Sequence, residues 1–235
     1  MADETIPRRD FLKGAMVGTA ALATGGPAAA QTAAPASAAQ ASPDAEPLLT
    51  LTATEHAFIV AAVDTLIPAD ELSPSGSACG VATFIDRQLA GAYGMGARLY
   101  RQGPFPKAKP ELGYQLSLNP REFFRAGIES ANVWTRKTYG QDFDRLSEMD
   151  REAALKAMEG DKAPFPGFSS RMFFDALLQI TMEGFFSDPI YGGNRNKAGW
   201  RLIGFPGVIA VHREDIVKYR DKEFPAEPLG IADLS

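Results

Sequence analysis

The sequence is poor in the side chains that hold metals and redox cofactors. Its 235 residues include one cysteine, Cys79, and two histidines, His56 and His212. One cysteine cannot form an intrachain disulfide, attach haem through Cys-x-x-Cys-His, hold an iron–sulfur cluster or build a cysteine zinc site. The histidines are far apart and neither has a ligand spacing, so a solvated or structural role is the simpler interpretation of both.

The motifs of several common enzyme classes are also missing. The sequence contains no Gly-x-Ser-x-Gly elbow, no glycine fingerprint after a strand and no Walker-type loop. The formal net charge is −5, without a basic patch or a basic amphipathic helix, so we expect no nucleic-acid partner. These absences disfavour a nucleotide-binding unit and an α/β-hydrolase.

The N-terminus has the features of a twin-arginine export signal. Paired arginines precede an apolar stretch too short to span a bilayer, and small residues follow at the spacing of a signal-peptidase site. The arginines and the apolar pair after them are Arg8, Arg9, Phe11 and Leu12, and the small residues are Ala28 and Ala30. This order predicts a signal over residues 1–30, cleaved after Ala30, and a periplasmic protein. The Ala/Ser/Pro-rich residues 31–47 predict a flexible linker.

Helical periodicity dominates the rest of the chain. Apolar spacing and cap residues such as Thr52, Asn119 and Ser147 predict five helices, at about residues 53–67, 78–89, 120–138, 148–159 and 171–186. A further short helix is expected around residues 98–102. In the last long helix we expect the inward side chains to be Phe173, Phe174, Leu177, Leu178 and Met182. We therefore predict a mainly α fold: residues 48–235 as a compact single domain of about five helices, with long ordered loops rich in glycine, proline and aromatics.

Cys79 has two interpretations. It is either a small buried or half-exposed thiol at the start of a helix, or a partner in an intermolecular disulfide. The second follows because an unpaired cysteine is a liability in the oxidising compartment that the export signal implies. The residues alone leave both open.

Residues 185–207 read FFSDPIYGGNRNKAGWRLIGFPG, without a clear helix or strand pattern. A loop this long in a compact domain is typically functional or disordered. Its aromatic anchors favour order, and tyrosine, tryptophan and arginine are also the side chains that dominate protein–protein hot spots. The residues fit two interpretations equally, a cover for the core or a docking surface. The candidate docking residues are Phe185, Phe186, Asp188, Tyr191, Asn194, Arg195, Trp200 and Phe205.

Two parts of this stretch carry a family resemblance: Phe185-Phe186-Ser187-Asp188-Pro189-x-Tyr191-Gly192-Gly193-Asn194 and Lys197-x-Gly199-Trp200-x-x-Ile203-Gly204-Phe205-Pro206-Gly207. They resemble the signature of the gluconate 2-dehydrogenase subunit 3 family. Two earlier pieces agree with it. One is Leu66-Ile67-Pro68-Ala69-Asp70 followed by Gly80 and Phe84-Ile85-Asp86, and the other is the twin-arginine leader. The resemblance covers about residues 51–211.

The resemblance implies the small (gamma) subunit of a periplasmic flavin-dependent dehydrogenase complex. The catalytic partner would be a glucose–methanol–choline-type flavoprotein that holds FAD and oxidises gluconate, a sugar or a polyol. A c-type cytochrome would take the electrons in complexes that have one, and the complex could associate with the membrane. This chain would hold no cofactor or metal and have no catalytic residue. Its signal would carry the folded flavoprotein through the twin-arginine translocase.

Two alternatives remain from the residues. One is an independent periplasmic enzyme, such as a hydrolase that uses acidic residues and one histidine. The other is a sugar-binding module that uses Tyr191, Asn194 and Trp200, because aromatic faces and amides suit carbohydrate.

Overall fold

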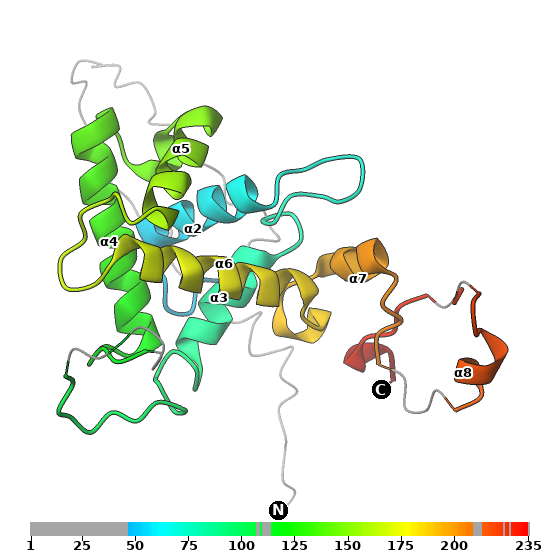
Figure 1. The fold of residues 1–235 in the computed structure, drawn as a ribbon. Helices are drawn as coiled ribbons and strands as arrows, with labels where there is room; N and C mark the ends of the chain where they lie inside the picture. Colours follow the sequence, from blue (N-terminus) through cyan, green and yellow to red (C-terminus); the bar gives the residue numbers. More distant parts are fainter. Residues whose placement is uncertain are drawn as a thin grey trace, which may run out of the picture. The chain divides into compact units, whose positions relative to one another are not determined.

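Helices are the main secondary structure in the described part of the chain (Figure 1). The structure, a computed structural model, describes residues 47–106, 109, 114–208, 213–222, 224–225 and 227–234. Within these ranges the helices are α2 (Ala53–Leu66), α3 (Val81–Ala90), α4 (Pro120–Tyr139), α5 (Glu148–Glu159), α6 (Ser170–Phe186), α7 (Ala198–Ile203) and α8 (Asp215–Lys218). The 3₁₀ turns are η3 (Phe143–Arg145), η4 (Pro189–Tyr191), η5 (Arg195–Lys197) and η6 (Ile231–Leu234). The mainly α prediction is confirmed.

Some predictions fall outside these ranges. The export signal with Arg8, Arg9, Phe11 and Leu12 lies there, as do linker residues 31–46 and His212. The division into signal, linker and domain stays a prediction.

Local capping signals set the starts of two long helices. At α2, Glu55 donates its backbone N–H to Thr52 Oγ1 at 3.2 Å, and Thr52 donates its own to Glu55 Oε2 at 2.7 Å. Asn119 and Glu122 make the same reciprocal pair at α4, with both distances 2.8 Å. Each box satisfies two backbone donors that the first helical turn leaves unpaired. The predicted caps are therefore confirmed.

Two helix predictions need correction. Helix α3 begins at Val81 and not at Ala78, because Gly80 takes a left-handed conformation with φ 80°. The short helix expected around residues 98–102 is wrong, since turns and irregular chain occupy that stretch. There Leu99 donates its backbone N–H to Gly96, which has φ 74°, and this closes a tight turn.

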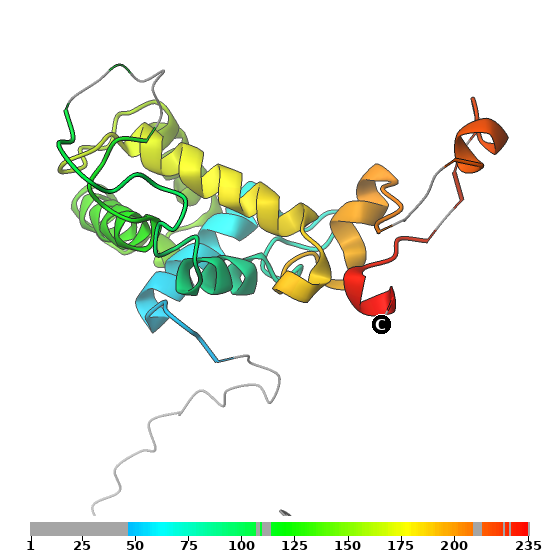
Figure 2. The ribbon, with the colours of Figure 1, turned by 90° about the horizontal axis from the view of Figure 1, so that it is seen from below.

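Helix α6 lies at the centre of the packing and contacts α2, α3, α4, α5 and α7. Figure 2 shows it, in yellow, running across α2 and α3. Phe173, Phe174 and Leu177 are buried as predicted, but Leu178 and Met182 are 36% and 42% exposed, so their predicted inward orientation is wrong. The buried face turns instead through Ile180, Thr181, Gly184 and Phe185.

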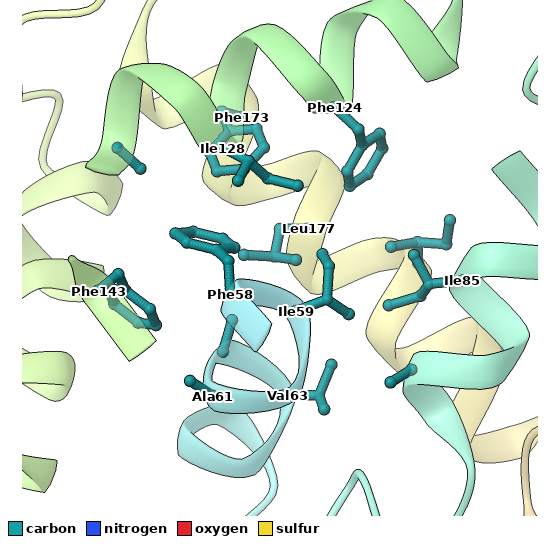
Figure 3. Packing of buried hydrophobic residues seen from close by; sticks show 14 of the residues in the cluster. Phe58, Ile59, Ala61, Val63, Ile85, Phe124, Ile128, Phe143, Phe173 and Leu177 are labelled. Carbon is teal, nitrogen blue, oxygen red and sulfur yellow. The ribbon is translucent and has the colours of Figure 1, made fainter. Parts of the chain in front are cut away.

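An aromatic cluster fills the space between α2, α4 and α6. Figure 3 shows Phe58 and Ile59 of α2 pointing toward α4 and toward Leu177 of α6. The Phe173 ring lies 6.1 Å from Phe58 and 5.9 Å from Phe124, measured between centroids, within the range at which tilted and edge-on rings attract. The cluster fixes the crossing of α4 and α6.

Gly127 allows that crossing to be close. A β-carbon at this position of α4 would lie 2.1 Å from Phe173 Cδ2. Phe173 is fully buried among other phenylalanine rings, so its own ring has no room to move away.

We expect Gly127→Ala to lower the free energy of unfolding by about 1–3 kcal/mol through overpacking. The clash should outweigh the gain of up to about 1 kcal/mol that alanine brings to a helix interior. The matched control is Glu129→Ala, an exposed change on the same helix that should stay within about 0.5 kcal/mol. Chemical denaturation measures both, and an unchanged or raised stability for Gly127→Ala would contradict this packing.

A buried carboxylate anchors the chain where it enters the domain. Asp86 of α3, which is 3% exposed, accepts backbone N–H groups from Leu49 at 2.6 Å, Thr50 at 3.0 Å and Leu51 at 2.8 Å. Arg125 of α4 donates to the Thr50 carbonyl at 2.8 Å. Charge-assisted hydrogen bonds of this kind are stronger than neutral ones. They join the residues that follow the linker to two helices of the core.

Candidate functional site

The 185–207 segment begins where α6 ends and runs through η4 and η5 into α7, coloured yellow to orange in Figure 1. Asp188 starts η4, because its Oδ1 accepts the Ile190 backbone N–H at 3.0 Å. Gly192, with φ 98°, ends this turn. Helix α7 was missed because it has six residues, follows a left-handed Lys197 and has no side-chain cap.

Asn194 holds the two ends of the turn together. Its side chain is fully buried, and its Nδ2 donates to the Ser187 carbonyl at 2.8 Å while its Oδ1 accepts the Gly199 N–H at 2.8 Å. The residue is left-handed, with φ 45° and ψ 41°, a conformation that asparagine tolerates better than most residues. One amide thus joins the end of α6 to the start of α7.

Two glycines bring the segment against α6 at backbone distance. A β-carbon at Gly193 would lie 2.2 Å from the Gly184 carbonyl oxygen, and one at Gly199 would lie 2.3 Å from that of Phe185. A larger residue at either position would push α7 away from α6. The segment is therefore closely packed and ordered.

The segment also binds to the start of α3. Arg195 donates its backbone N–H to the Cys79 carbonyl at 2.9 Å. A β-carbon on Gly80 would lie 2.3 Å from the Gly192 carbonyl oxygen. Two stretches that are more than a hundred residues apart in the sequence thus form one site.

The structure divides the predicted docking residues into two groups. Phe185, Asn194 and Trp200 are buried, and the Trp200 indole donates to the Phe186 carbonyl at 2.8 Å. In contrast, Tyr191 is 50% and Phe205 44% exposed. Arg195 is also exposed, whereas Phe186 and Asp188 are half-buried. The side chains of the first group are buried, and those of the second are partly or largely accessible to solvent. Their role in docking stays a prediction.

Sequence reasoning missed further exposed apolar side chains in the same segment. Ile190 is 50% exposed, and Leu202 and Ile203 of α7 are 42% and 59% exposed. Without a recognised helix over residues 198–203, nothing in the sequence indicated which of these side chains face outward. With Tyr191 and Phe205 they form what we call the exposed apolar set.

Cys79 is buried, with 1% exposure, and its Sγ lies 3.6 Å from the Pro74 carbonyl. Burial raises the pKa of the thiol, and the Asp64 carboxylate raises it further, so the reactive thiolate is disfavoured. A disulfide with another chain would require this turn to move. The intermolecular disulfide stays a prediction.

His56 lies on α2 and is half-buried. Burial lowers its pKa, and the Asp86 carboxylate partly opposes this shift. The neutral imidazole is therefore favoured at neutral pH.

The described residues bring no group of three or more His, Cys, Asp or Glu side chains together as a metal site. A pocket of about 270 Å³ is lined by residues 99–102, 104–106 and 114–116, and by none of the predicted site residues. No described helix has both the length and the apolar character needed to cross a bilayer. The close packing of the 185–207 segment and its exposed apolar side chains can hold a surface rigid and offer apolar contacts.

Comparison with known families identifies the domain. The model of the gluconate 2-dehydrogenase subunit 3 family matches residues 53–207. The chain belongs to this family. The match spans α2 to α7 and ends at Gly207, so the whole 185–207 segment lies within the gluconate 2-dehydrogenase subunit 3 domain.

A second match concerns the N-terminus. The model of the twin-arginine translocation signal sequence matches residues 5–25, which include Arg8, Arg9, Phe11 and Leu12. This supports export of the subunit 3 chain across the cytoplasmic membrane. No match was found among the curated proteins or among the solved structures.

We expect Asn194→Gly to destabilise the segment by about 2–3 kcal/mol, because it leaves the Ser187 carbonyl and the Gly199 N–H without their buried partner. Glycine keeps the left-handed conformation, so backbone strain does not contribute. Asn196→Gly is the matched control, since Asn196 is also left-handed, with φ 56°, but exposed. Hydrogen exchange at Gly199 and thermal melting measure the effect, and equal behaviour of the two variants would contradict the role of Asn194.

Proposed function

We propose that this chain is the non-catalytic small subunit of a flavin-dependent dehydrogenase complex that oxidises gluconate, a sugar or a polyol. In this role it stabilises the catalytic FAD subunit and carries it through the twin-arginine translocase to the periplasm. The observation that carries the proposal is the family match over residues 53–207 on a chain that also has a twin-arginine signal at residues 5–25.

The arrangement of the 185–207 segment supports a docking role. Buried Asn194 and Trp200 hold the segment rigid, while Tyr191 and Phe205 remain exposed. Rigid aromatic anchors give binding energy at a low entropic cost, because little side-chain freedom is lost on binding. We propose that the exposed apolar set contacts a glucose–methanol–choline-type flavoprotein, which holds the FAD. A c-type cytochrome would be a third component.

The export route supports the carrier role. The twin-arginine system moves folded proteins, and a flavoprotein folds around its flavin before export. A catalytic subunit without its own signal can then cross the membrane only when bound to a chain that has one. This chain has a signal and a domain of the matching family.

The sugar-binding alternative has less support. It needs Asn194 and Trp200 to face a ligand, yet both are buried and both use their polar groups on backbone carbonyl or N–H groups of this chain. Dye reduction with sugars, measured for the chain alone and for the chain co-expressed with a glucose–methanol–choline-type flavoprotein, separates the alternatives. Activity of the isolated chain would favour the independent enzyme.

Changing Arg8 and Arg9 together to lysine should leave the dehydrogenase activity in the cytoplasm, because the paired arginines are what the translocase recognises in the leader. Lys13→Arg, in the same leader, keeps the pair and should export normally. Activity is measured in periplasmic and cytoplasmic fractions of cells that produce both subunits. Periplasmic activity in the double-lysine variant would show that the flavoprotein travels without this chain.

Tyr191→Ala should weaken capture of the flavoprotein by about 5- to 30-fold, which corresponds to the loss of about 1–2 kcal/mol from an interface anchor. Tyr191 is half exposed, so the melting temperature of the isolated chain should change little. Tyr100→Ala is the matched control, an 82% exposed tyrosine outside the 185–207 segment.

Trp200→Ala should behave differently from Tyr191→Ala. It removes a buried indole and should lower the free energy of unfolding by about 3–5 kcal/mol. Pull-down of the flavoprotein together with thermal melts separates the two effects. Normal capture by a folded Tyr191→Ala chain would rule out docking through this residue.

A further inference from the structure

The chain returns to the 185–207 segment after the family match has ended. Residues 227–234, which we call the C-terminal strap, lie beyond the matched range. The strap pairs with the end of the segment, where Val208 donates its N–H to the Leu229 carbonyl at 2.7 Å and Leu229 donates to the Pro206 carbonyl at 3.1 Å. This pairing is an isolated parallel bridge between Gly207 and Leu229.

The strap reaches three further points of the segment. Ile231 donates its backbone N–H to Asp188 Oδ2 at 2.8 Å, at the start of η4. Lys197, directly before α7, pairs with Asp233. Arg201 of α7 pairs with Glu227, with 3.3 Å between Nε and Oε2. The contacts thus span the segment from η4 to the residues after α7.

The inner and outer sides of the segment are held by different elements. On the inner side, Asn194 fastens it to the end of α6, and the Arg195 backbone fastens it to Cys79, just before α3. The strap supplies ties to Asp188 and Lys197 on either side of Tyr191, and to the backbone next to Phe205. It therefore restrains the turns that carry the exposed apolar set.

We propose that the C-terminal strap is a clasp that holds the exposed side of the 185–207 segment in the geometry that the catalytic subunit contacts. The purpose of the clasp rests on the proposed function, whereas its holding action can be measured on this chain alone. Removing the strap should loosen η4 and α7 and weaken docking, while the helices α2 to α6 remain folded.

The strap's ties suit a clasp that can also open. The Arg201–Glu227 pair has side chains that are 53% and 81% exposed, and surface pairs of this kind are weak and screened by salt. Lys197 and the Gly230 backbone lower the pKa of Asp233, so this carboxylate stays charged well below neutral pH. Salt should therefore loosen the strap more readily than mild acid.

Two variants test the clasp. The first is a shortened chain that ends after residue 226 and therefore lacks the strap. The second is Asp188→Asn, which keeps Oδ1 as the cap for Ile190 but replaces Oδ2, the acceptor for Ile231, by an amide that donates. The matched control is Asp70→Asn, because Asp70 Oδ1 caps another turn, accepting from Leu72 and Ser73 at 2.8 Å, away from the strap.

The first readout is amide hydrogen exchange, measured for the unchanged chain and for both variants without a partner. Loss of the ties should speed exchange at Tyr191 and Gly192 by about tenfold in both variants, and at Ile231 in Asp188→Asn. The helical circular dichroism and its melting should remain. Unchanged exchange at Tyr191 and Gly192 in the shortened chain would overturn the clasp, and so would melting of the helices together with these turns.

The second readout is capture of the co-expressed flavoprotein. Both variants should capture it about tenfold more weakly than the unchanged chain, and Asp70→Asn should capture it normally. If the shortened chain captures the flavoprotein as tightly as the unchanged chain does, or more tightly, the proposal is overturned. The strap would then be neutral or would compete with the partner. Failure of the unchanged chain to capture any flavoprotein would instead count against the proposed function, and the exchange data would still decide whether the strap holds the segment.

Discussion

The 185–207 segment depends on the side-chain amide of Asn194. This buried group joins the Ser187 carbonyl to the Gly199 N–H, so the last residues of α6 and the first of α7 cannot separate without leaving polar groups unpaired. Close backbone approaches at Gly193 and Gly199 require this same arrangement. The buried Trp200 at the start of α7 is placed by this arrangement, and its indole donates to the Phe186 carbonyl at the end of α6.

Different side chains of the 185–207 segment serve packing and the proposed docking. Phe185 of α6 is buried in the core and the buried Trp200 donates to the Phe186 carbonyl, whereas Tyr191 and Phe205 remain accessible. A surface built in this way is already ordered before a partner arrives, which reduces the entropy lost on binding. This suits the docking role that we propose for the chain.

Gly80 and Asp86, two residues of the earlier part of the family resemblance, have structural explanations. Gly80 lets the start of α3 approach the Gly192 carbonyl, and Asp86 on the same helix binds the backbone of residues 49–51. One helix therefore connects the chain that follows the signal and linker to the 185–207 segment. A single short element supports both features that the proposed carrier role needs.

Local interactions were sufficient to predict much of the fold from the sequence. The capping boxes at Thr52 and Asn119, the mainly α class and the ordered nature of the 185–207 segment followed from neighbours a few residues apart. The export signal was likewise predicted from the order of features near the N-terminus, and the signal-sequence model matches residues 5–25. The exposure of Leu178 and Met182, the short helix α7 and the division of the aromatics into buried and accessible groups were decided by tertiary contacts. The physical reason is that one sequence pattern of tyrosine, tryptophan and phenylalanine suits a core and an interface equally, and only packing against α3 and α6 determines which side chains water can reach.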